Sequence, residues 1–77
     1  MNTIKITYGN NMKRGTVLEP DTKTPRQVFD ENEVNYATGI TTLDGAPLGR
    51  GDLDKTFAEL GITEKCYLLN VVKADNA

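Results

Sequence analysis

Residues 41–69 read TTLDGAPLGRGDLDKTFAELGITEKCYLL, and the order of parts in this stretch decides the fold. A short extended run from residue 39 to Leu43 meets Asp44-Gly45, a dipeptide typical of a two-residue hairpin turn. Residues 46–48 can then pair back briefly, and Pro47 restricts this return strand to the edge of a sheet. The first half of the stretch therefore predicts a tight hairpin.

The second half of the stretch predicts a short helical turn followed by a strand. Asp52 or Asp54 can cap the turn. Gly61 suits the left-handed position after its end, with Ile62 supplying the hydrophobic contact that follows. Apolar residues then recur at positions i, i+4 and i+7, which forms one apolar stripe: Leu53, Phe57 and Leu60.

The last strand is expected at residues 66–72, where apolar side chains occur at nearly every position. Because side chains alternate between the two faces of a strand, one set must face the core and the other must face away. We expect the core set to be Tyr67, Leu69 and Val71. That assignment leaves Leu68, Asn70 and Val72 on the opposite face.

The N-terminal half predicts a hairpin. Residues 3–8 alternate with the period of a half-buried strand, and we expect Ile4, Ile6 and Tyr8 to face inward. Residues 9–11, Gly-Asn-Asn, form a turn, and residues 12–19 form the partner strand. Within that strand we expect Leu18 to face inward, in a register that a slip of one residue would reverse.

The start of a helix follows the hairpin. Thr24 can act as the N-cap, Pro25 fits the first helical position, and Gln27 lies three residues after the cap, which together form a capping box. We expect Val28 and Phe29 to face the core. The polar segment 30–33 indicates that the helix is short or has a fully solvated outer face.

These elements predict an α+β fold in which one mixed sheet packs on one helix. An exposed hairpin cannot bury its own apolar face, and a single helix with Val28 and Phe29 can cover it. A second long helix, which a ferredoxin-like fold requires, is not supplied by residues 52–60. We expect one domain over residues 1–73 and a flexible tail at 74–77.

Composition excludes several functional classes. The chain has 77 residues, a net charge of −2, no histidine and one cysteine, Cys66. A disulfide within the chain is impossible, a zinc site and a cofactor are not expected, and no basic stripe favours nucleic acid. No apolar run is long enough to cross a membrane and no signal peptide is evident, so we expect a cytoplasmic protein.

Eight apolar and glycine positions then carry a resemblance to a known family. Their spacing resembles that of the second half of ubiquitin. The run Leu-Glu-Pro-Asp at 18–21 resembles the segment of ubiquitin that precedes its helix. The chain is most similar to the small prokaryotic ubiquitin-related proteins of mobile cassettes that also encode ParB-related and ThiF-related proteins. The positions are Leu43, Gly45, Leu48, Leu53, Leu60, Ile62, Leu69 and Val71.

The resemblance implies a ubiquitin-like β-grasp domain and a place in a conjugation-like or regulatory system. The implied partners are a ubiquitin-activating-type (ThiF-like) enzyme or a metalloprotease of the same cassette. Ubiquitin and the related sulfur carriers act through a C-terminal Gly-Gly, whereas this sequence finishes Asp-Asn-Ala and has its last glycine at Gly61. We therefore expect a non-catalytic protein-binding adaptor or regulator. The alternative is a modifier or sulfur carrier with an atypical C-terminus.

The solvent-facing side of the sheet is the leading candidate site. Ubiquitin-like domains bind partners through a small apolar patch in this region, and an apolar cluster ringed by polar residues marks an interaction site. The alternative is that Leu68 or Val72 belongs to the core in the opposite register. The predicted partner-binding residues are Lys5, Thr7, Thr42, Leu68, Asn70 and Val72.

Overall fold

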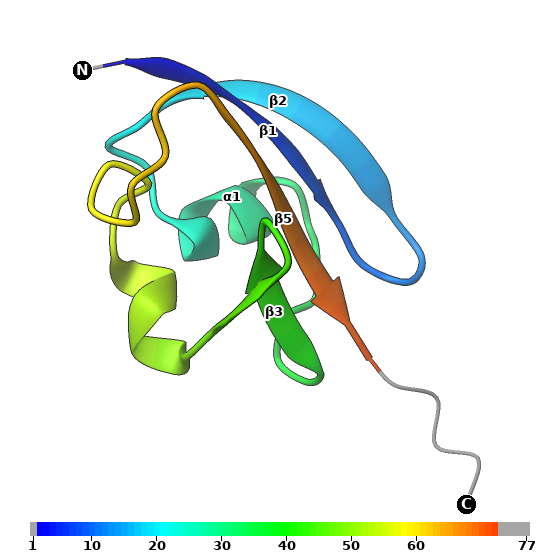
Figure 1. Ribbon diagram of the computed structural model, residues 1–77. Helices are drawn as coiled ribbons and strands as arrows, with labels where there is room; N and C mark the ends of the chain where they lie inside the picture. Colours follow the sequence, from blue (N-terminus) through cyan, green and yellow to red (C-terminus); the bar gives the residue numbers. More distant parts are fainter. Residues whose placement is uncertain (1, 73–77) are drawn as a thin grey trace, which may run out of the picture.

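The computed structural model describes residues 2–72, which form one five-stranded mixed sheet with a short helix on one face (Figure 1). The strand order is β2-β1-β5-β3-β4, and the central strands β1 and β5 are parallel while the other neighbours are antiparallel. The predicted α+β architecture is confirmed. The elements are β1 (Thr3–Gly9), β2 (Arg14–Pro20), α1 (Pro25–Glu31), β3 (Ile40–Leu43), β4 (Ala46–Leu48), the 3₁₀ helix η1 (Arg50–Asp54) and β5 (Lys65–Val71).

The hydrophobic core lies between α1 and one face of the sheet. Strand β1 alternates as predicted, so Ile4, Ile6 and Tyr8 are buried against the helix side. Helix α1 contributes Val28 and Phe29, which are both fully buried, as the sequence predicts. Each such side chain stabilises the fold by about 1.5–3 kcal/mol relative to exposure, so this layer fixes which face of the sheet remains open.

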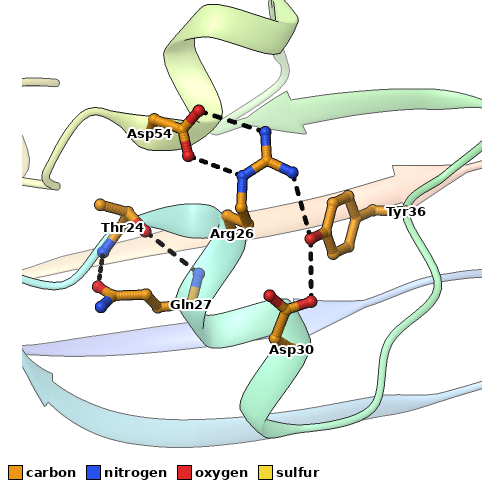
Figure 2. A network of polar contacts seen from close by, with 6 residues as sticks. All are labelled: Thr24, Arg26, Gln27, Asp30, Tyr36 and Asp54. Carbon is orange, nitrogen blue, oxygen red and sulfur yellow. Dashed lines mark hydrogen bonds and ion pairs between the residues drawn. The ribbon is translucent and has the colours of Figure 1, made fainter.

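Helix α1 begins at the predicted capping box (Figure 2). The Thr24 hydroxyl accepts a hydrogen bond from the Gln27 backbone N–H at 3.2 Å, and the Gln27 side chain accepts one from the Thr24 N–H at 2.9 Å. The helix ends at Glu31, where Val34 N–H bonds to the Phe29 carbonyl at 2.9 Å. This bond spans five residues and belongs to a Schellman motif.

The connection before β5 differs from the single helical turn that the sequence predicts. Helix η1 ends at Asp54, and Lys55 is extended, with φ −86° and ψ 145°. Thr56 then starts a second turn, because its hydroxyl accepts from the Glu59 N–H at 3.1 Å. The N-cap of η1 is Gly49, and Asp52, three residues later, accepts a hydrogen bond from the Gly49 N–H, so the expected cap at Asp52 or Asp54 is wrong. Local capping by Thr56 therefore divides the stretch, although Leu53 and Phe57 are both buried as expected.

Gly61 closes this second turn as predicted. Its φ is +87°, Ile62 N–H bonds to the Phe57 carbonyl, and Gly61 N–H bonds to the Ala58 carbonyl. The two bonds define a Schellman motif. The Asp44-Gly45 turn is also confirmed, with φ of 52° and 86° at its two residues, as a type I′ hairpin requires.

Two strand registers differ from the prediction. Leu18 is 70% exposed on β2, and Val17 packs against the core in its place. On β5 the buried residues are Cys66, Leu68 and Asn70, whereas Tyr67 and Val71 are exposed. Residues that pair across neighbouring strands share a face of the sheet. Glu19 pairs with buried Ile4, and Cys66 pairs with buried Ile6, so both strands present the opposite faces to those expected.

The expected tail at 74–77 lies outside the described residues, as does Lys73, the end of the expected domain. Within residues 2–72 no helix is long and apolar enough to cross a membrane.

Candidate functional site

The open face of the sheet, which lies away from α1, carries most of the exposed apolar side chains of the strands. Registers place its residues in rows, with Thr42 beside Leu69 and Ile40 beside Val71. Tyr67 precedes Leu69 on the same face of β5. We call these four apolar residues the apolar patch: Ile40, Tyr67, Leu69 and Val71.

The apolar patch is accessible. Ile40, Tyr67 and Val71 are 60%, 55% and 50% exposed, and Leu69 is half-buried. Full burial stabilises a large apolar side chain by about 1.5–3 kcal/mol. An exposed apolar cluster of this kind is therefore unfavourable in water and is stabilised when a partner covers it. The patch is the arrangement on the described residues that fits a protein partner best.

The six residues predicted for partner binding separate into three groups, of which Val72 alone forms the third. Lys5, Thr7 and Thr42 lie on the open face, on strands β1 and β3. Leu68 and Asn70 are fully buried on the helix side and cannot contact a partner, which corrects the prediction. The reason is the register of β5, which turns its other set of apolar residues outward.

Val72 follows the end of β5 and continues the alternation of Leu68 and Asn70, away from the apolar patch. The Asn11 side chain bonds to both backbone groups of Val72, as a neighbouring strand would. The Asn11 amide donates to the Val72 carbonyl and accepts from the Val72 N–H, both at 3.0 Å. The first turn of the sheet thereby fixes the position at which the chain leaves β5.

Among residues 2–72, the charged side chains that the strands place on the open face are all basic. They are Lys5, Lys65 and Arg14, and none forms an ion pair with another described residue. Lys5 and Lys65 are direct neighbours across β1 and β5, where like charges repel. Glu19, the acidic residue of β2, pairs with buried Ile4 and therefore faces the helix side.

A notch adjoins the apolar patch at the end of β1. Gly9 has no side chain and lies between Arg14 on β2 and Leu69 on β5. A cavity of about 330 Å³ opens here, and it is lined by Asn10, Asn11, Arg14, Leu69, Asn70 and Val71. A Cβ atom at Gly9 would approach Arg14 Cγ to 2.9 Å, so the stem of this arginine crosses close to the glycine.

A second polar cluster lies on the helix side (Figure 2). Arg26 donates to both carboxylate oxygens of Asp54, at 2.7 and 3.3 Å, and to the Tyr36 hydroxyl at 3.3 Å. The Tyr36 hydroxyl donates to Asp30, and its ring stacks on Phe29 with centroids 5.3 Å apart. Asp54 holds the pKa of Arg26 above its ordinary value. This cluster joins α1 to η1 and to the following loop, and its groups already satisfy one another.

The thiol of Cys66 is poorly placed for nucleophilic chemistry. The side chain is buried on β5, and desolvation, with a smaller contribution from Asp44, raises its pKa to about 12. A thiolate is the reactive form of cysteine, and a raised pKa keeps this thiol protonated near neutral pH. The described residues also contain no group of three or more histidine, cysteine and acidic side chains suited to a metal ion.

Comparison with solved structures identifies the fold. The chain is similar to the ubiquitin-like domain of the Arabidopsis thaliana protein At2g32350, with a TM-score of 0.64, 23% identity, and coverage of 100% of this chain and 84% of that one. It is equally similar in shape to the ubiquitin of Caldiarchaeum subterraneum, with a TM-score of 0.64, 14% identity, and coverage of 99% and 100%. No protein-family model matches the sequence, and no curated protein matches it. The fold is a ubiquitin-like β-grasp.

Proposed function

We propose that this protein is a non-catalytic, ubiquitin-like binding module that docks a partner protein on its open sheet face. The apolar patch carries the proposal, because four neighbouring apolar side chains remain accessible on one face while the opposite face is filled by the core. Thr7 and Thr42 border the patch with hydroxyl groups. This combination of an apolar centre and a polar rim is typical of protein interfaces.

The lack of a reactive constellation favours binding over catalysis. The sequence contains no histidine, and its one cysteine is a protonated, buried thiol at neutral pH. The proposed role is that of an adaptor or regulator in a bacterial mobile-element or conjugation-like system in the cytoplasm. Its proposed partner is a ThiF-like activating enzyme or a metalloprotease of the same cassette.

The test removes the apolar patch while keeping the sheet intact. Ile40 and Val71 are direct cross-strand neighbours, so Ile40→Lys with Val71→Glu replaces an apolar pair by an opposite-charge pair that strands tolerate. The control is Ala37→Lys with Ala58→Glu, two exposed positions outside the strands. The free energy of unfolding of both variants should lie within about 1 kcal/mol of that of the parent chain, because surface substitutions have small effects.

Affinity capture from the native host then separates the outcomes. We expect the control to retain the partner and the patch variant to lose it. If the folded patch variant captures the same partner at the same level, the open face is not the docking surface. An isopeptide or thiocarboxylate found by mass spectrometry on the protein from its native host would instead favour the alternative function of a modifier or sulfur carrier.

A further inference from the structure

Arg14 has the position and the free donors to recognise a charged group of the partner. Its guanidinium carries five N–H donors, and none of them bonds to another described residue. In contrast, Arg26 donates to Asp54 and Tyr36. Arg14 is exposed on the open face and lies at the edge of the notch beside Gly9.

The notch combines this charge with apolar walls. Leu69 and Val71 of the apolar patch line the same cavity as Arg14, and Asn10 and Asn11 supply further amide groups. Four of the six residues that line the notch are polar and two are apolar, so it suits a polar or charged group that has an apolar neighbour. A group bound in the notch would therefore touch the arginine and the apolar patch together.

The charge of the open face determines the chemistry of that group. Lys5, Lys65 and Arg14 are its charged strand residues, whereas the whole chain has a net charge of −2. Asp44, the acidic residue at the hairpin turn, lies outside the strands, and its carboxylate accepts from the Tyr67 N–H at 2.9 Å. The charged strand residues of this face are all basic, which is complementary to an anionic partner.

We propose that Arg14 is a specificity-determining residue of the docking surface, and that it binds a carboxylate of an acidic partner segment whose neighbouring apolar residue covers Leu69 and Val71. Guanidinium and carboxylate match in a planar, two-bond geometry, which an ammonium group cannot reproduce. The inference rests on the proposed function, because it names the partner chemistry of the same open face.

The test is selection of random twelve-residue peptides displayed on phage against the full 77-residue chain. We expect the selected peptides to carry aspartate or glutamate next to leucine, isoleucine, valine or phenylalanine. Each enriched peptide is then synthesised beside a version with its acidic residues changed to the corresponding amides. Affinities are measured by calorimetry, and the contact surface is mapped by backbone amide chemical shifts.

Two matched variants isolate the arginine. Arg14→Gln should weaken binding of the acidic peptide roughly tenfold, in line with a hydrogen bond to a charged group, and should leave the amide version unchanged. Arg50→Gln removes the same charge from an exposed position in η1, outside the sheet, and should leave both affinities unchanged. Added salt should weaken the acidic peptide more than the amide version.

Each remaining outcome has a defined meaning. If the selected peptides lack acidic residues, or bind the Arg14→Gln chain as tightly as the parent chain, the proposed role of Arg14 is wrong. That result leaves the proposed docking on the open face unaffected. If the peptides bind undiminished to the Ile40→Lys, Val71→Glu chain, the proposed function fails. A selection that enriches no sequence counts against both.

Discussion

Glu33 occupies a backbone conformation that suits glycine, and exchanging it should stabilise the protein. It lies at the C′ position after α1 with φ +58°, where its N–H bonds to the Asp30 carbonyl at 3.3 Å. A side chain with a Cβ atom costs about 1–2 kcal/mol in this left-handed region. Its side chain is exposed and forms no hydrogen bond or ion pair with the described part of the chain.

The magnitude follows from two opposing effects. Glu33→Gly removes the left-handed cost, but glycine also gives the unfolded chain more freedom, which lowers stability by about 0.5–1 kcal/mol. Removing a negative charge from a helix C-terminus adds a few tenths. We expect a net gain of about 1 kcal/mol in the free energy of unfolding. For a chain of this size the melting temperature should rise by about 4–8 °C.

Two controls separate the backbone effect from the charge effect. Glu33→Ala removes the same charge but keeps the Cβ atom, so it should gain only the few tenths from the helix end. Gly61→Ala makes the opposite exchange at the second Schellman motif, where φ is +87° and no atom lies within 4 Å of the added Cβ. It should lose about 1 kcal/mol through backbone strain alone.

The assay is urea unfolding followed by circular dichroism, with thermal unfolding as a second measurement. We expect the order of stability, from highest to lowest, to be Glu33→Gly, Glu33→Ala, the parent chain and Gly61→Ala. If Glu33→Gly is no more stable than Glu33→Ala, the left-handed conformation does not limit stability at this position.

Three other predictions concern the core and the helix cap. Leu68→Ala should lower the free energy of unfolding by about 2–5 kcal/mol, and Val71→Ala by less than about 1, because only Leu68 is buried; equal losses in urea unfolding would contradict the register of β5. Burial raises the pKa of the Cys66 thiol from 9.0 to about 12, so its contribution leaves the free energy of unfolding unchanged below about pH 9 and lowers it as the pH rises toward 12. Cys66→Ala should remove that part of the decline, and an unchanged pH profile would count against it. Thr24→Ala should cost about 1 kcal/mol in thermal unfolding through loss of the cap, and no loss would argue against it.

The features that the sequence predicted correctly are set by neighbouring residues. The capping box needs only Thr24 and Gln27, and the hairpin turn needs only Asp44 and Gly45. Gly61 likewise ends its turn through bonds to residues within five positions. Chemistry of such short range is visible in the sequence because the partners are read together.

The contacts that the sequence missed join distant residues. Arg26 and Asp54 are 28 positions apart, and Asn11 and Val72 are 61 apart. No local pattern marks such pairs, since each residue also suits a solvated surface. The proposed role of Arg14 is the same kind of case, because it depends on Gly9 being its partner on β1 and on Leu69 being the partner of Gly9 on β5.

The faces of β5 could not be assigned from sequence because both sets of side chains are apolar. One face of β5 carries Cys66 and Leu68, and the other carries Leu69 and Val71, so either face could pack in the core. The buried face also contains the polar Asn70, which the sequence would place in solvent. The Asn70 amide donates to the Thr41 hydroxyl at 3.1 Å, which partly satisfies it inside the protein. A strand that only stabilised the fold would need one apolar face. Because the core uses Leu68, the second apolar row of β5 remains exposed and forms the proposed docking surface.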